Sequence, residues 1–409
     1  MRSVHADTVF TGDAGAIRDG AVVLDAHGAV VDVGPAAQIL PRHAGISVER
    51  CFGVLMPGLV NAHTHLELSS LKGKVPGGQG FVPWVEHLIG ARVESPPEDD
   101  AGAIDAAIAE LDSSATAAVG EVTNSLSAVR SLARAGIGGC VFHEVFGVDR
   151  ESVGRRIAEL PRALEEHAPV WPTSDLAYSP TPHTLYTTHR SAVQRLAQEA
   201  RERGARISIH LAEHAAERRY LEHGDGPVAQ WYQSRLRIPP SPRSSPGAAS
   251  IALALELGVL APNVLCVHLT DARPEELALV AERGAPVVLC PRSNLYIETR
   301  LPPLLAMRSA GIQMALGTDS LASNASLDVL AEARALSERF PTVPASDLIR
   351  MATWEGARAL GRSDLGRICR GARPGLWLVA GAPGDDPCAF VLAKVREPRR
   401  WIARREGAQ

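Results

Sequence analysis

Residues 56–65 read Met-Pro-Gly-Leu-Val-Asn-Ala-His-Thr-His, an apolar run that ends on two histidines. Alternate side chains of an extended strand point to the same side, so His63 and His65 can share one metal ion. A His-x-His pair is weak evidence by itself, because paired histidines in loops often only hydrogen-bond. Other strand ends must therefore show whether the pair belongs to a larger site.

Three further apolar runs end on residues of the same kind. The run at 206–212 contains His210 near its end and is followed by Glu213. The run at 263–269 contains His268, and the run at 312–318 precedes Asp319. In a barrel of parallel strands the carboxyl ends meet at a common mouth. The four strand ends therefore predict one site.

Apolar runs alternate with helical stretches eight times between residues 54 and 360. Eight strand–helix units predict a distorted TIM (β/α)8 barrel over 54–363, and an open doubly wound sheet, the alternative, would need a Gly-rich turn after its first strand. Helices are expected at 102–112, 189–203 and 275–283. The strands are expected at 54–62, 115–123, 137–146, 173–179, 206–212, 263–269, 286–291 and 312–318.

The two ends of the chain differ in texture from this middle part. Residues 1–53 and 364–409 hold short strand-like runs broken by Gly and Asp, including 376–379 and 389–392. We expect both ends to form one small β-sandwich beside the barrel. Residues 224–248 are rich in Gly, Pro, Ser and Arg and predict a loop over the barrel mouth.

Composition excludes several classes of protein. The 409 residues are 45% hydrophobic and 22% charged, with a formal net charge of −4, which is too apolar for intrinsic disorder. No apolar run approaches the roughly 18–20 residues of a membrane span, and residues 1–7 lack the apolar core of a secretory signal, so a cytoplasmic protein is expected. Arginines alternate with acids, so nucleic acid is not an expected partner. The six cysteines show no CxxC pairing and are expected to be buried thiols.

On these residues the chain resembles the amidohydrolase superfamily, and specifically its adenine and nucleobase deaminase branch. The motifs are PGLVNAHTH at 57–65, HLAE at 210–213, the histidine at 268 and GTDS at 317–320. The resemblance implies one divalent metal ion per chain, with Zn²⁺ expected and Fe²⁺ or Mn²⁺ as alternatives. The ligands that it implies are His63, His65, His210 and Asp319.

The resemblance also implies catalytic roles. The metal would lower the pKa of its bound water toward neutrality. Asp319 would accept the proton of that water, and His268 would hold the hydroxide or polarise the developing oxyanion. Glu213 would protonate a ring nitrogen and then the leaving ammonia. Together these groups predict hydrolytic removal of the 6-amino group of an adenine-type nucleoside.

Lysine occurs only at positions 72, 74 and 394. Binuclear members of the superfamily bridge two metals with a carboxylated lysine at the end of strand four, and residues 75–393 contain none. This absence excludes the hydantoinase and dihydroorotase type of site. Glu144 could be a bridging carboxylate as in a few deacetylases, but a supporting or packing role is favoured.

Three segments resemble the aminodeoxyfutalosine deaminases of the futalosine route to menaquinone. They are HLELSSL at 65–71 continuing to GFVPW at 80–84, CPRSN at 290–294, and GTDSLASN at 317–324. Deaminases of methylthioadenosine, S-adenosylhomocysteine or adenosine are the alternative, and an inactive, metal-free binding protein on the same fold is a distant one. A small nucleoside is the expected partner, and a homodimer remains open.

The resemblance suggests a set of substrate-binding residues. His183 matches a substrate-contacting histidine after strand four, although it could instead cap a helix. Glu67 could bind a ribose hydroxyl or form a structural salt bridge, and either Arg92 or Arg292 could meet a substrate carboxylate. Phe81 and Trp84 are expected to pack a lid. The predicted substrate-binding set is Glu67, His183, Asn294 and Ser320.

Overall fold

The computed structural model describes residues 1–13, 15–95, 98–171, 174–235 and 248–404. Eight parallel strands form its larger part, in two four-stranded sheets ordered β5-β6-β7-β8 and β12-β11-β10-β9. These strands are β5 (Leu59–Thr64), β6 (Thr116–Thr123), β7 (Gly138–Val145), β8 (Leu176–Pro182), β9 (Ile207–Leu211), β10 (Val264–His268), β11 (Val287–Leu289) and β12 (Met314–Leu316).

The two sheets meet at both edges through a few hydrogen bonds and, in the part of the chain that the structure describes, through no continuous strand pairing. Thr64, at the end of β5, forms a parallel bridge to Asp319, just beyond β12. On the other edge the backbone N–H of Ser208 in β9 donates to Oγ1 of Thr181 in β8 at 2.8 Å. The predicted parallel α/β architecture is confirmed. Among the described residues the strand ladder is not closed, so the closed barrel stays a prediction.

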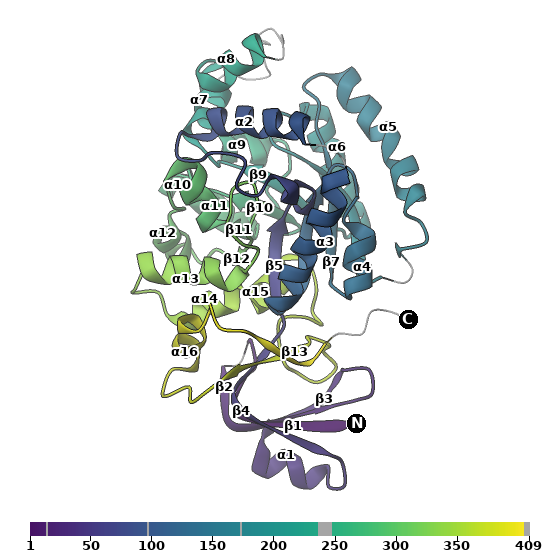
Figure 1. The fold of residues 1–409 in the computed structure, drawn as a ribbon. Helices are drawn as coiled ribbons and strands as arrows, with labels where there is room; N and C mark the ends of the chain where they lie inside the picture. Colours follow the sequence, from purple (N-terminus) through teal and green to yellow (C-terminus); the bar gives the residue numbers. More distant parts are fainter. Residues whose placement is uncertain (14, 96–97, 172–173, 236–247, 405–409) are drawn as a thin grey trace.

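Helices surround these strands (Figure 1). All residues of β6 and β7 are buried, as expected where both faces of a parallel sheet are covered. The helices expected at 102–112, 189–203 and 275–283 correspond to α3, α6 and α10. The helices of this part are η1 (Leu66–Leu71, a 3₁₀-helix), α2 (Phe81–Glu94), α3 (Glu98–Ser113), α4 (Val129–Ala135), α5 (Arg150–Glu166), α6 (Arg190–Arg203), α7 (Ala215–His223), α8 (Pro227–Ser234), α9 (Ser250–Glu256), α10 (Pro274–Arg283), α11 (Pro291–Glu298), α12 (Leu304–Ser309), α13 (Val329–Arg339), α14 (Ala345–Met351) and α15 (Trp354–Ala359).

Both ends of the chain contribute to one six-stranded sheet, ordered β14-β13-β4-β1-β2-β3. In Figure 1 this sheet lies below the parallel strands, with the purple N-terminal strands beside the yellow C-terminal segment. Its strands are β1 (Arg2–Phe10), β2 (Ala16–Leu24), β3 (Val30–Pro35), β4 (Val48–Pro57), β13 (Leu376–Ala380) and β14 (Arg400–Ala403), with α1 (Ala36–Arg42) following β3. A sandwich and the domain limits at 53 and 364 stay predictions.

The expected first strand at 54–62 is wrong in its boundaries. Residues 54–57 belong to β4, which pairs with β1 and β13, and β5 begins only at Leu59. Gly58 separates the two strands in a crowded position, where an added Cβ would lie 2.4 Å from the carbonyl oxygen of Pro374 and 2.5 Å from Cβ of Ala117. The apolar run continues through this crossing, so the sequence pattern did not reveal it.

The expected strand at 389–392 is also wrong, because these residues lie in helix α16 (Pro387–Ala393). The Asp386 carboxylate accepts hydrogen bonds from the backbone N–H groups of Cys388 and Ala389, both at 2.9 Å. Pro387 occupies the first turn, where a missing N–H costs nothing. The local start signal therefore outweighs the apolar run.

Part of the loop expected at 224–248 is helical, since α8 covers Pro227–Ser234. Residues 236–247 of that prediction lie outside the described residues. The six cysteines are unpaired, and all but Cys369 are buried, as predicted. In the described part of the chain, no helix is both long and apolar enough to cross a membrane.

Candidate metal centre

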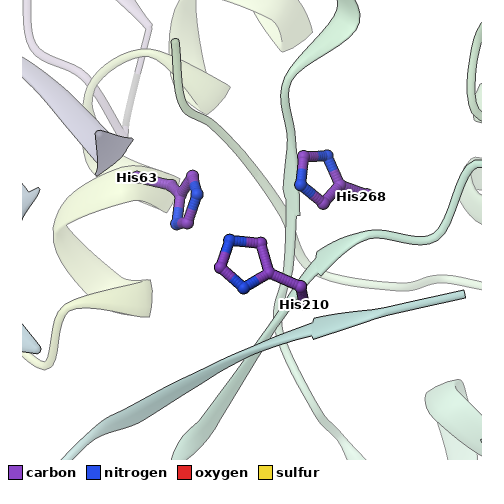
Figure 2. Close-up of side chains that lie close together, drawn as sticks. All are labelled: His63, His210 and His268. Carbon is purple, nitrogen blue, oxygen red and sulfur yellow. The ribbon is translucent and has the colours of Figure 1, made fainter. Parts of the chain in front are cut away.

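Three histidines from different strands face one another at the carboxyl ends of the parallel strands (Figure 2). They are His63 in β5, His210 in β9 and His268 at the end of β10. Their ring centroids are 4.9 Å apart for His63 and His210, 5.5 Å for His210 and His268, and 5.9 Å for His63 and His268. One nitrogen from each ring lies within 4.8 Å of the others, which is close enough to surround one ion.

The remaining predicted ligands join this cluster. Nε2 of His65 lies 3.3 Å from Nε2 of His210 and 3.7 Å from Oδ1 of Asp319. Oδ1 of Asp319 is also 4.0 Å from Nε2 of His63. The structure therefore brings His63, His65, His210 and Asp319 together, although the first and the last of them are 256 residues apart in the chain.

The electrostatics of the histidines suit a metal ion. Both ring nitrogens of His63 are buried without a hydrogen-bond partner, which is costly for a polar group unless another ligand satisfies it. Burial lowers the pKa of His63 well below its usual value, and burial lowers the pKa of His210 and of His268 to about 3. These imidazoles are neutral at pH 7, so their lone pairs are free to bind a divalent metal.

Asp319 is held so that one of its carboxylate oxygens faces the histidines. Oδ2 accepts hydrogen bonds from Ser293 Oγ at 2.5 Å and from Ser323 Oγ at 3.1 Å, which leaves Oδ1 directed at His63 and His65. The backbone N–H of Asp319 donates to the carbonyl of His63 at 3.1 Å. Asp319 adopts a φ of +57°, a strained conformation that recurs at functional sites.

Glu213 and His268 form a buried pair beside the four ligands, with Oε1 of Glu213 3.5 Å from Nε2 of His268. Burial, reinforced by the charge of Asp319, raises the pKa of Glu213 well above its usual value. A carboxyl group whose pKa is raised in this way holds its proton more readily than a free glutamate, so Glu213 is suited to donate one. The amide of Asn294 lies 3.1 Å from Nδ1 of His268 and fixes the orientation of that ring.

Glu217 fixes the backbone that carries Glu213. Its carboxylate accepts hydrogen bonds from the backbone N–H groups of Ala212 and Glu213, both at 2.9 Å. Burial raises the pKa of Glu217 to about 7. Ala212 has a φ of +47°, a strained backbone conformation at this turn. The two hydrogen bonds to Glu217 hold the backbone in this conformation and so fix the position of Glu213.

Glu144 and His183 lie behind His210, on the side of the ring away from His65. Oε1 of Glu144 is 3.4 Å from Nδ1 of His210, and the His183 carbonyl accepts from the same nitrogen at 3.2 Å. Such contacts orient a metal-binding imidazole and leave its other nitrogen free. Glu144 thus has the supporting place that the sequence favoured.

The amidohydrolase family profile matches residues 54–400. The chain belongs to the amidohydrolase family. The predicted resemblance is confirmed, and two curated relatives cover most of this amidohydrolase. The aminodeoxyfutalosine deaminase of Deinococcus radiodurans is 28% identical over 373 residues, 88% of this chain and 86% of its own. The 5-methylthioadenosine/S-adenosylhomocysteine deaminase of Halobacterium salinarum is 30% identical over 378 residues, 89% of this chain and 80% of its own.

Two solved structures share the fold of this amidohydrolase. The aminofutalosine deaminase of Helicobacter pylori, in complex with methylthio-coformycin, superposes with a TM-score of 0.86 at 24% identity and covers 98% of both chains. An adenosine deaminase of Xanthomonas campestris with bound zinc superposes with a TM-score of 0.76 at 26% identity, over 98% of this chain and 89% of that one. A divalent metal at the histidine cluster fits both the geometry and this zinc-bound relative.

Glu67 of the amidohydrolase lies in η1, and its carboxylate accepts hydrogen bonds from residues 123–125 at the end of β6. It accepts from Thr123 Oγ1 and the backbone N–H of Asn124, both at 2.9 Å, and from the N–H and Oγ of Ser125 at 3.1 and 2.6 Å. These bonds are internal to the protein. They tie the segment after His65 to the end of β6.

Glu121, which the sequence reasoning missed, supports the same segment. It is buried in β6, and both of its carboxylate oxygens accept from the backbone N–H of Leu66, at 3.1 and 3.2 Å. Burial, with the charge of Glu67 second, raises its pKa well above the usual value. An acidic residue inside the otherwise apolar run TAAVGEVT at 116–123 was the signal that could have revealed it.

The other predicted substrate-binding residues differ in whether their polar atoms already have hydrogen-bond partners. The hydroxyl of Ser320 is buried without a hydrogen-bond partner, whereas Nδ1 of His183 lies 2.7 Å from Thr187 Oγ1. Arg92 donates to the carbonyl of Glu67 and to Asp100, and Arg292 donates to Ser326. Both candidate arginines for a substrate carboxylate are therefore already bonded within the protein.

Phe81 and Trp84 lie at the start of α2, beside the segments that carry the site. The ring of Phe81 stacks on His214, with centroids 4.0 Å apart and planes 14° apart. His214 itself caps α7 by accepting from the backbone N–H of Glu217, so it has a structural role. Trp84 packs with Leu71 in one buried cluster. The expected packing of these aromatic residues is consistent with this arrangement.

Proposed function

We propose that this amidohydrolase removes the 6-amino group of an adenine-type nucleoside by hydrolysis, with aminodeoxyfutalosine as its first substrate. The observation that carries the proposal is the buried pair of Glu213 and His268, 3.5 Å apart, beside the four predicted metal ligands. We also infer that the eight parallel strands act as a distorted TIM barrel over 54–363, with a small β-sandwich from 1–53 and 364–409. That arrangement would place all of these groups at one mouth.

Each residue of the site has a separate role in the proposed reaction. His63, His65, His210 and Asp319 would hold one divalent ion, Zn²⁺ as the first choice, which when bound supplies an activated water at neutral pH. Asp319 Oδ1 is free to accept a proton, because both serines bond only Oδ2. Glu213 gives its proton to the ring nitrogen next to the amino-bearing carbon, where it stays in the product. The hydroxyl proton of the resulting adduct then recharges Glu213, which passes it to the amino group as that group leaves as ammonia. The proton that Asp319 took from the water finally restores the acid form of Glu213. His268, held by Asn294, stabilises the oxygen that adds to that carbon.

His183 and Ser320 are the proposed contacts to the rest of the nucleoside. Ser320 directly follows Asp319 and has a free buried hydroxyl, and the His183 ring centroid lies 5.0 Å from that of His210. Glu67 acts on the substrate indirectly in this proposal, because its carboxylate already bonds residues 123–125. Asn294 bonds His268 through its amide nitrogen, and its buried Oδ1, which has no hydrogen-bond partner, is a third proposed contact.

A substrate panel tests the proposal. Zinc-loaded protein is assayed for ammonia release from aminodeoxyfutalosine, methylthioadenosine, S-adenosylhomocysteine and adenosine, and kcat/KM values are compared. The highest kcat/KM is expected for aminodeoxyfutalosine. A preference for methylthioadenosine or S-adenosylhomocysteine would replace the substrate and keep the chemistry, since a relative bears that name at 30% identity.

A further inference from the structure

A second cavity lies at the opposite end of the parallel strands from the metal centre. Its volume is about 560 Å³, within the range of small-molecule pockets. It is lined near the amino ends of four strands, by Cys140 in β7, Ala177 in β8, Arg206 just before β9 and Asn263 just before β10. The histidines lie toward the carboxyl ends of these strands, and Arg206 and His210 are four residues, or about 13 Å, apart along β9, so the two sites are separate.

The lining of this cavity is cationic. Three guanidinium groups, those of Arg201, Arg206 and Arg362, line it together with polar groups such as Ser179 and Asn263, and no carboxylate of the described residues does. Arg362 is neutralised by Asp175 and Asp364, each at 2.7 Å. Arg201 and Arg206 form no ion pair with any residue in the described ranges. The cavity therefore carries uncompensated positive charge.

Both unpaired arginines are held in place by carbonyl groups. Arg206 donates to the carbonyls of Pro262 and Arg358, and it lies so close to Gly361 that a Cβ there would be 2.9 Å from its Nε. Arg201 donates to the carbonyl of Gly258 at 2.6 Å. A guanidinium has five N–H donors, so each side chain is fixed by the protein and keeps donors to spare.

Two other arginines of α6, the helix that carries Arg201, are paired. Arg195 and Arg203 of α6 both bond Glu199, at 2.7 and 2.8 Å. Arg206 is half-buried, and burial lowers its pKa. The nearby Cys140 acts in the opposite direction, and Arg358, which is itself paired with Glu355, acts in the same direction as burial. A half-buried guanidinium without a counterion of its own costs free energy that a bound anion would offset.

We propose that this cavity binds a phosphate group, free or carried by a small metabolite, between Arg201 and Arg206. A phosphate offers several acceptor oxygens to two planar guanidinium groups, which bind such oxyanions in a bidentate manner. The cavity exceeds the size of a phosphate ion, so it has room for a small organic group attached to it. Binding here is independent of the chemistry at the metal centre.

Isothermal titration calorimetry tests the site on the metal-loaded protein, with inorganic phosphate and with ribose 5-phosphate, against sodium chloride at matched ionic strength. Saturable binding of at least one phosphate probe is expected. Arg201→Gln and Arg206→Gln should each raise Kd about tenfold or more, the loss expected for one charge-assisted hydrogen bond. The probe with the lower Kd shows whether the phosphate is free or esterified.

Arg195→Gln is the matched control, since it removes the same charge from the same helix outside the cavity, and it should leave Kd unchanged. If Arg206→Gln does not fold, Arg206→Lys tests the same position, because it keeps the charge and removes the planar guanidinium. The Arg201→Gln variant alone also tests the site, because Arg201 is exposed and its replacement should not disturb folding. Absence of saturable binding, or an equal loss in Arg195→Gln, would overturn the proposal. So would a Kd unaffected by both cavity substitutions, because phosphate would then be binding at the metal.

Discussion

The two oxygens of the Asp319 carboxylate lie in different surroundings, and this difference organises the site. Oδ2 is bonded by Ser293 and Ser323, whereas Oδ1 faces the histidines. The sequence predicted Asp319 itself, because an acid directly after an apolar strand is conspicuous. It did not predict the two serines, since Ser293 lies 26 residues away and only the fold brings it to the carboxylate.

Replacing either serine should weaken metal binding without removing a ligand. Ser293→Ala and Ser323→Ala are each expected to raise the zinc Kd about 10-fold to 100-fold, as is typical of residues that orient a ligand. Competition with a chromophoric chelator measures this. Ser309→Ala, at an exposed position at the end of α12, is the control and should bind zinc normally. Normal zinc binding in both site variants would show that the serines do not orient Asp319.

Glu213 should be needed for turnover and not for metal binding. Glu213→Gln keeps the shape of the side chain and removes the proton that it donates, so kcat is expected to fall about 10²-fold to 10⁴-fold with full zinc content. Zinc is measured by atomic emission and turnover by ammonia release. Glu282→Gln, on the exposed end of α10, should behave as wild type. Retention of activity in Glu213→Gln would reject its role as proton donor.

The buried histidines should stay neutral in mildly acidic solution. Because burial lowers the folded-state pKa of His210 and His268 to about 3, only acid near that pH should charge them in the metal-free protein. Their imidazole ¹⁵N shifts are therefore expected to keep the neutral pattern from pH 7.5 to 5. A titration midpoint near 6.5, the value of a free histidine, would contradict the burial that the structure shows.

At the scale of elements, periodic patterns predicted the helices and most short apolar runs predicted strands, but two of those runs were misread. Helices α3, α6 and α10 follow from their spacing of apolar residues, and the buried strands follow from their β-branched runs. The run at 389–392 lies in a helix that Asp386 caps, although a strand was expected there. The run expected as one strand at 54–62 forms parts of two strands, which Gly58 separates. A run of four apolar residues fits either structure, so its neighbours decide.

The crossing at Gly58 should not tolerate a side chain. Gly58→Ala places a Cβ against the Pro374 carbonyl and Ala117, and is expected to destabilise the protein by about 1–3 kcal/mol, as overpacking does. Gly90→Ala is the matched control: it lies within α2 with nothing near its added Cβ, and should stabilise by about 0.5–1 kcal/mol. Urea unfolding measures both. Equal stability of Gly58→Ala and wild type would show that the crossing is not tightly packed.

For the whole molecule, the sequence predicted which strand ends converge and therefore most of the site. It missed the contacts between distant segments, which are the hydrogen bonds of Glu67 to residues 123–125 and of Glu121 to Leu66. It also missed the strained backbone at Asp319. Such contacts depend on how strands are placed side by side, and no local pattern reports that. The unpaired arginines at the other end of the strands were equally hidden among many arginines.

The central claim is that one metal ion, held by these strand ends, drives deamination of an adenine-type nucleoside. Its most direct test measures metal content and ammonia release from aminodeoxyfutalosine on the same samples, as zinc is removed by a chelator and restored. The account predicts one ion per chain at full activity and ammonia release in proportion to occupancy. Full occupancy without ammonia release from aminodeoxyfutalosine, methylthioadenosine, S-adenosylhomocysteine or adenosine would contradict it.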